Sequence, residues 1–91
     1  MPDSLTDYQN LLTELIKKQI VILGPDIAVL KARNVSGLKV TDDGTVTHMS
    51  GNPQELLNQL VEQYMQLSGL IVKKAMEPLL AKYPSITLPH A

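Results

Sequence analysis

The chain of 91 residues contains no cysteine, tryptophan or phenylalanine, and its aromatic side chains are those of Tyr8, Tyr64 and Tyr83. Without cysteine, disulfides and thiolate metal sites are excluded. With so few aromatic rings, the core has to be built from leucine, isoleucine, valine and methionine. Two histidines, His48 and His90, would form a zinc site only if subunits shared ligands. We therefore expect no bound metal.

Long apolar runs are also absent. No run approaches the 18 residues of a membrane span, and the first residues are acidic and polar instead of basic and then apolar. We therefore expect no membrane partner and a cytoplasmic protein. Hydrophobic residues make up 44% of the chain, which indicates one globular domain, in the size range where oligomerisation often adds stability.

The longest helical pattern covers residues 53–83. Asn52 before it can accept hydrogen bonds from the first free backbone N–H groups, and Pro53 supplies the φ of the first turn. A straight helix of this length would measure about 46 Å, whereas a compact chain of this size has a diameter of roughly 30 Å. Ser68-Gly69 and Pro78 are both candidate bends, and we place the bend near Pro78.

Apolar residues in the second half of this helix spread over more of its circumference than the face of one small domain explains. We therefore expect an interface there, either with a second copy of the chain or with a helix of a partner protein. The predicted interface residues are Leu70, Ile71, Val72, Met76, Leu79, Leu80 and Tyr83.

Two further helices precede the long one. Helical spacing of apolar residues predicts a helix over 4–23, although residues 20–23 are apolar on all sides and could instead form a short strand. Gly24-Pro25 ends this helix and begins a short helix over 25–34. At the other end of the chain, 84–91 is predicted to be an extended tail that could add an edge strand to a sheet.

A β-hairpin is predicted over 38–49, because Asp43-Gly44 lies between two segments of strand character. A two-residue turn and a three-residue loop are both possible. We choose the three-residue loop with Gly44 in the left-handed conformation, because it gathers the apolar residues on one face. The complete prediction is an α+β fold in the order helix, short helix, hairpin, long helix.

The predicted hairpin could form a small-molecule pocket together with the helices. His48 shares the apolar face of its strand, so its ring could be a base or a ligand. The predicted pocket residues are Leu38, Val40, His48 and Tyr64.

No catalytic constellation is present in the sequence: there is no nucleophile triad, no pair of carboxylates and no glycine-rich phosphate loop. Asp42-Asp43-Gly44 is similar to part of a calcium loop, but a hairpin turn explains it fully. We expect a protein that is not an enzyme and binds no cofactor.

Three functions remain as hypotheses. The first is a protein-interaction or regulatory module that acts through its long amphipathic helix as a homodimer. The second is a ligand-sensing domain that uses the pocket. The third is nucleic-acid binding through segment 17–39, which is rich in basic residues, although the net charge of −1 argues against it. The basic residues of that segment are Lys17, Lys18, Lys31, Arg33 and Lys39.

Overall fold

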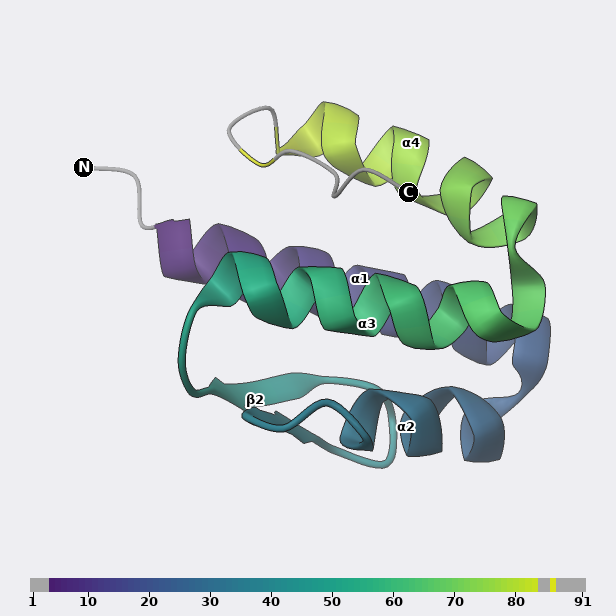
Figure 1. Ribbon diagram of the computed structural model, residues 1–91, viewed down its shortest axis with the longest axis horizontal. Coiled ribbons are helices and arrows are strands. Elements are labelled where there is room, and N and C mark those ends of the chain that lie inside the picture. The colour runs from purple at the N-terminus through teal and green to yellow at the C-terminus, as the bar shows by residue number, and fades with distance from the viewer. Residues whose placement is uncertain (1–3, 84–85, 87–91) are drawn as a thin grey trace.

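The computed structural model describes residues 4–83 and 86, which form four helices and a two-stranded antiparallel sheet (Figure 1). The elements in chain order are α1 (Ser4–Leu23), α2 (Pro25–Arg33), β1 (Leu38–Val40), β2 (Val46–Met49), α3 (Pro53–Ser68) and α4 (Leu70–Lys82). The α+β fold predicted from the sequence is confirmed. The predicted long helix, however, is two helices.

Helix α1 is the central element, because it packs against α2, α3, α4 and β2. Figure 1 shows α1 and α3 side by side, with α4 along one side of this pair and α2 with the hairpin along the other. The core between these layers is aliphatic apart from Tyr64 and Gln19. Helix α1 contributes the fully buried side chains of Leu11, Leu12, Leu15 and Ile16.

A single residue, Gly24, joins α1 to α2. Its N–H donates to the carbonyl of Ile20 at 2.9 Å, and its own carbonyl accepts from the N–H of Ala28 at 3.1 Å. Its φ of +89° lies in the region that glycine adopts without steric cost. Residues 20–23 therefore belong to α1 and do not form a strand, and the two helices meet at a sharp corner.

The break between α3 and α4 lies at Gly69, which has a φ of +45°. The N–H of Gly69 donates to the carbonyl of Met65 at 3.2 Å, and its carbonyl accepts from the N–H of Val72 at 3.1 Å. The prediction of one helix bent near Pro78 is wrong, since Pro78 lies inside α4. Because the left-handed region suits glycine, the chain leaves one helix at Gly69, and α4 runs back along the molecule (Figure 1).

The hairpin has the predicted three-residue loop. The N–H of Thr41 donates to the carbonyl of Thr45 at 2.9 Å, and Gly44 has a φ of +91°. A Cβ at Gly44 would lie 2.7 Å from Cδ1 of Ile20, so the turn fits closely against α1. The loop choice is therefore confirmed.

One feature of β2 was missed: its register shifts by one residue, with Thr47 as the extra residue of a bulge. The pairs are Leu38 with Met49, Lys39 with His48, and Val40 with Val46. The bulge turns His48 away from the face that Val46 occupies, so the side chain of His48 is exposed. The prediction that His48 shares the apolar face is wrong.

Side chains of α1 hold β2 next to this bulge. Oγ1 of Thr13 accepts from the N–H of Val46 at 3.0 Å, and Nε2 of Gln9 donates to the carbonyl of Val46 at 2.7 Å. These bonds take the outward-facing groups of Val46, which a two-stranded sheet would otherwise leave to water. These bonds come from α1, so the periodicity of the strand does not predict them.

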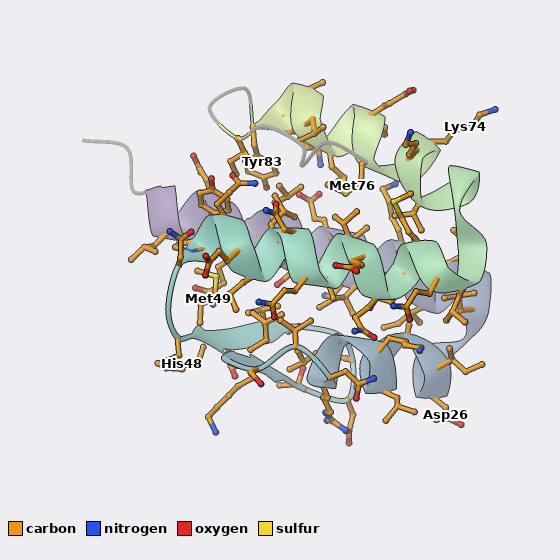
Figure 2. The ribbon with its side chains drawn as sticks, viewed as in Figure 1. Asp26, His48, Met49, Lys74, Met76 and Tyr83 are labelled. Carbon is orange, nitrogen blue, oxygen red and sulfur yellow. The ribbon has the colours of Figure 1, made fainter. Side chains whose placement is uncertain are left out.

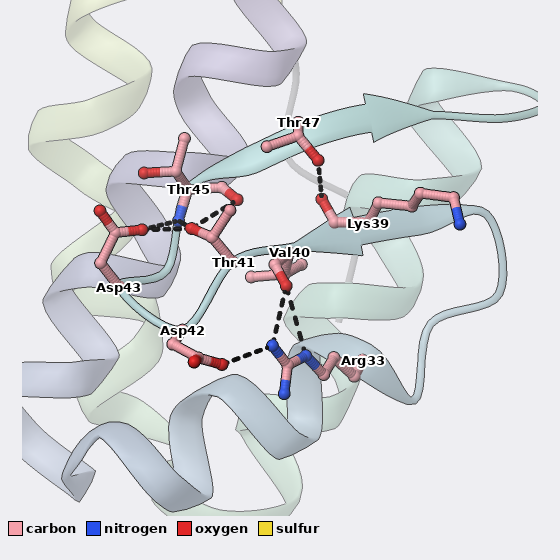
Figure 3. A network of polar contacts seen from close by, with 8 residues as sticks. All are labelled: Arg33, Lys39, Val40, Thr41, Asp42, Asp43, Thr45 and Thr47. Atoms are coloured by element: carbon pink, nitrogen blue, oxygen red, sulfur yellow. Dashed lines mark hydrogen bonds and ion pairs between the residues drawn. The ribbon is translucent and has the colours of Figure 1, made fainter.

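Arg33 of α2 holds the other strand. Its Nε and Nη2 donate to the carbonyl of Val40 at 3.3 and 3.0 Å, and Nη2 also pairs with Oδ1 of Asp42 at 2.9 Å (Figure 3). Since an isolated two-stranded hairpin is marginal in water, these contacts with both flanking helices give it the support it needs.

Within the described residues, the sheet has no third strand. The N–H of Ile86 donates to the carbonyl of Tyr83 at 2.9 Å, which is a turn, and the side chain of Ile86 packs into the core. At Ile86 the chain therefore does not pair with the hairpin. Leu88 and the rest of the predicted tail lie outside the described residues.

Candidate functional site

The predicted interface on the second half of the long helix is part of the core. Val72, Met76 and Leu79 are buried, and Leu80 and Tyr83 pack partly buried against the same core. Figure 2 shows Met76 between α4 and the α1–α3 pair. The side chains of Leu70 and Ile71 lie outside the described residues. Because the break at Gly69 brings α4 back onto α1, the chain itself covers Val72, Met76 and Leu79, and these residues give no reason to place an interface there.

The last turn of α4 is fastened to α1 through Glu14. Nζ of Lys82 pairs with Oε1 of Glu14 at 2.7 Å, and the hydroxyl of Tyr83 donates to Oε2 at 2.8 Å. The bond from Lys82 lowers the pKa of Glu14, and acceptance by Glu14 raises the pKa of Tyr83 to about 12. Both oxygens of the Glu14 carboxylate therefore bind the C-terminal end of α4 and hold it against α1.

Three of the four predicted pocket residues belong to the core. Leu38, Val40 and Tyr64 are buried in the core, and the hydroxyl of Tyr64 donates to the carbonyl of Ala28 at 2.7 Å. Burial raises the pKa of this hydroxyl well above its ordinary value. Figure 2 shows His48 at the outer edge of the hairpin, where it borders a surface depression of about 260 Å³ together with Leu38, Gly37, Lys39 and Ser50. Two of the four predicted residues, Leu38 and His48, therefore line one depression, whereas Val40 and Tyr64 do not line it.

Segment 17–39 does not offer its most specific phosphate-binding group. The guanidinium of Arg33 is engaged by the carbonyl of Val40 and the carboxylate of Asp42. Asp43 is equally occupied in the turn, since it accepts from the hydroxyl of Thr41 and from the N–H of Thr45. The Asp42-Asp43-Gly44 stretch thus acts as a turn that is bound to α2.

A different surface gathers exposed apolar side chains. The last turns of α1 and α3 and the first turns of α2 and α4 lie at the same end of the molecule (Figure 1). At this end Val21 is 86% exposed, Ile22 43%, Ile27 47% and Leu67 48%. We call these four residues the apolar end. Single exposed apolar residues are ordinary, but several from three helix termini at one end indicate a contact surface.

A basic groove and a depression of mixed charge lie at the apolar end. Between α1 and α4 lies a groove of about 420 Å³ lined by Lys18, Val21, Ile22, Lys74 and Ala75. Along α2 lies a depression of about 520 Å³ lined by Pro25, Asp26, Val29, Leu30, Arg33 and Asp42. Figure 2 shows Lys74 and Asp26 at this end, on opposite sides of the α1–α3 pair. At this end Lys74 therefore shares a groove with Val21 and Ile22, and Asp26 precedes Ile27 on α2.

Sequence reasoning missed the apolar end, although a signal was present. Residues 20–23 are apolar on all sides, and a helix has only one face to bury against a small core. Some of these side chains had to remain exposed once the segment formed the last turn of α1. The signal was interpreted as a question of helix or strand, which left Val21 and Ile22 without a role.

Other kinds of site are not seen in the described part of the chain. No three histidine, aspartate or glutamate side chains among residues 4–83 and 86 are grouped so that they could hold a metal ion. None of the helices described has the length and apolar character needed to cross a membrane. Comparison with known proteins adds no relative, because no family model, curated protein or solved structure matches the chain.

Proposed function

We propose that the protein is a non-enzymatic interaction module that works as a homodimer and uses the apolar end as its contact surface. The observation that supports this most is the exposure of Val21, at 86% the most exposed large apolar side chain among the described residues. Burying a valine or isoleucine side chain contributes about 1.5–3 kcal/mol. An end with four such residues gains from contact with a second protein surface.

The proposal moves the contact surface away from the one expected from the sequence. The homodimer is kept, but Val72, Met76 and Leu79 stabilise the fold of one chain and leave the contact to the helix termini. A cytoplasmic location and the absence of catalysis remain part of the proposal, on the sequence arguments given above. Ligand sensing is not proposed, because Val40 and Tyr64 do not line the depression that Leu38 and His48 share.

The experiment is sedimentation equilibrium from about 5 to about 500 µM, the range in which a small interface of this kind dissociates. The wild-type mass should rise from that of one chain towards that of two. Val21→Lys should remain monomeric throughout, because a solvated ammonium group cannot be buried at the contact.

The matched control is Leu5→Lys, which makes the same kind of change at an exposed residue near the other end of the same helix. It should associate as the wild type does. A wild-type mass of one chain at every concentration would reject the proposal, and so would equal loss of association in both variants.

A further inference from the structure

The charges beside the apolar end restrict how two copies can meet. Among the described residues, the ion pairs are Arg33–Asp42 and Lys82–Glu14, so neither Lys74 nor Asp26 takes part in one. Both side chains are exposed. They lie at the same end of the molecule but on opposite sides of it (Figure 2).

Two simple end-to-end arrangements with two-fold symmetry exist for a pair of such molecules. In the first, the axis runs along the shortest axis of the molecule, which is the viewing direction of Figure 2. This rotation exchanges the two sides, so Lys74 of each copy lies opposite Asp26 of the other. In the second, the axis lies in the plane of that view, and Lys74 meets Lys74 while Asp26 meets Asp26.

Only the first arrangement is favoured electrostatically. It sets two pairs of opposite charge at the rim of the contact, whereas the second places like charges against each other twice. The apolar end takes part in the contact in both cases, so burial alone does not distinguish them. Charge selects the arrangement and apolar area supplies the attraction.

We infer that the partner of the apolar end is a second copy of this chain, related by a two-fold axis along the shortest molecular axis and selected by reciprocal Lys74–Asp26 pairs. This inference rests on the proposed function, since it specifies the geometry of the same contact. With closed two-fold symmetry, association should end at a dimer, because the apolar end of each copy is used up in the contact.

The size of the contact sets the expected strength. The principal extents of the molecule are 36, 24 and 19 Å, so the contact lies across the smallest face. Specific interfaces bury about 800 Å² on each partner, and an end face of 24 by 19 Å is smaller than that. The dimer is therefore a weak one, sensitive to single charges at its rim.

Charge reversal tests the arrangement. The dissociation constant is measured by sedimentation equilibrium for the wild type, Lys74→Glu, Asp26→Lys and the variant with both changes. Each single reversal turns two attractive pairs into two repulsive pairs, so the constant should rise about tenfold. The double reversal restores opposite charges and should bring it back to within about threefold of the wild type.

Circular dichroism shows whether each variant is folded, which is expected since both residues are exposed. Unchanged dissociation constants in the single variants, or a double variant no better than the singles, would overturn the arrangement. If Val21→Lys abolishes association while the charge variants behave in that way, the proposed function holds and this inference fails. If the wild type stays monomeric, both fail.

Discussion

The two halves of helix α1 contact their surroundings in different ways. In the part of the helix up to Glu14, Tyr8 donates to Gln54 of α3 at 2.7 Å, Gln9 and Thr13 bind Val46 of β2, and Glu14 binds the end of α4. In the last turns, Lys17, Lys18, Val21 and Ile22 are exposed. The same helix thus joins the fold through polar side chains at one end and presents apolar side chains at the other.

This difference separates the side chains that are bonded within one chain from those that are exposed for contact with another protein. Polar cross-links satisfy specific groups inside one chain and contribute about 0.5–1.5 kcal/mol each. Exposed apolar side chains make no such bonds, and they contribute favourable free energy only when a second surface buries them. The following predictions test this division, beginning with the largest effect.

The first prediction concerns the core that joins α4 to the rest of the molecule. Met76→Ala should lower the free energy of unfolding by about 2–5 kcal/mol, because it leaves a cavity at a fully buried position. Lys74→Ala on the exposed face of the same helix should change it by less than about 0.5 kcal/mol. Urea denaturation measures both. Equal effects would mean that α4 does not pack back onto the molecule.

The second prediction concerns the break that returns α4. Gly69→Ala should cost about 1–2 kcal/mol, because an L residue is strained at a φ of +45°. A Cβ there would meet no atom within 4 Å, so the cost comes from the backbone alone. Thermal or urea unfolding measures it. A stabilised variant would indicate one continuous helix over the α3–α4 region, as an unbroken periodicity suggests.

The third prediction compares the halves of α1 with mirrored substitutions of nearly equal volume. Thr13→Val should cost about 1 kcal/mol, because it removes the acceptor for the N–H of Val46. Val21→Thr should change stability by less than about 0.5 kcal/mol, since its side chain is exposed. The second variant should instead weaken association. A larger loss of stability in Val21→Thr than in Thr13→Val would contradict this difference between the two halves of α1.

The fourth and smallest prediction concerns pH. The pKa of Glu14 is lowered below its ordinary value of 4.5 in the folded protein. The contribution of Glu14 to the free energy of unfolding is therefore complete above pH 4.5, and it is lost as the pH falls through the pKa of the folded state. The stability difference between the wild type and Glu14→Gln, about 0.5 kcal/mol near neutral pH because the pair is partly exposed, should disappear in acid.

The hydroxyl of Tyr83 sets the upper end of the pH range in which α4 is held by these bonds. Its pKa is raised from 10 to about 12, so its contribution is complete below pH 10 and is lost between pH 10 and 12. Tyr83→Phe should therefore approach the wild type in stability across that interval. Unfolding midpoints measured against pH test both limits, and a constant difference would show that the bonds to Glu14 are absent in solution.

Much of the fold followed from local signals in the sequence. Gly24-Pro25 marked the corner between α1 and α2, Asp43-Gly44 marked the hairpin, and Asn52 marked the start of α3, where its side chain accepts from the N–H groups of Gln54 and Glu55. Each of these signals acts through backbone groups within a few residues, so the sequence alone contains it.

The misses have a common physical cause. Apolar periodicity continues across Gly69, so the pattern does not reveal that a positive φ breaks the helix and returns α4 to the core. The bulge at Thr47 depends on bonds from Gln9 and Thr13, which are more than thirty positions away from Val46. Both features involve contacts between distant segments, and the same packing buries Val72, Met76 and Leu79 of the predicted interface and Val40 and Tyr64 of the predicted pocket.

The most direct test of the account is the change in backbone amide chemical shifts when the protein is diluted from about 500 to about 5 µM, the range expected for a weak dimer. The account predicts changes at Val21, Ile22, Ile27, Leu67 and Lys74, and constant shifts at Tyr8, Gln9 and Thr13. Changes confined to the first half of α1, or no change anywhere, would contradict it.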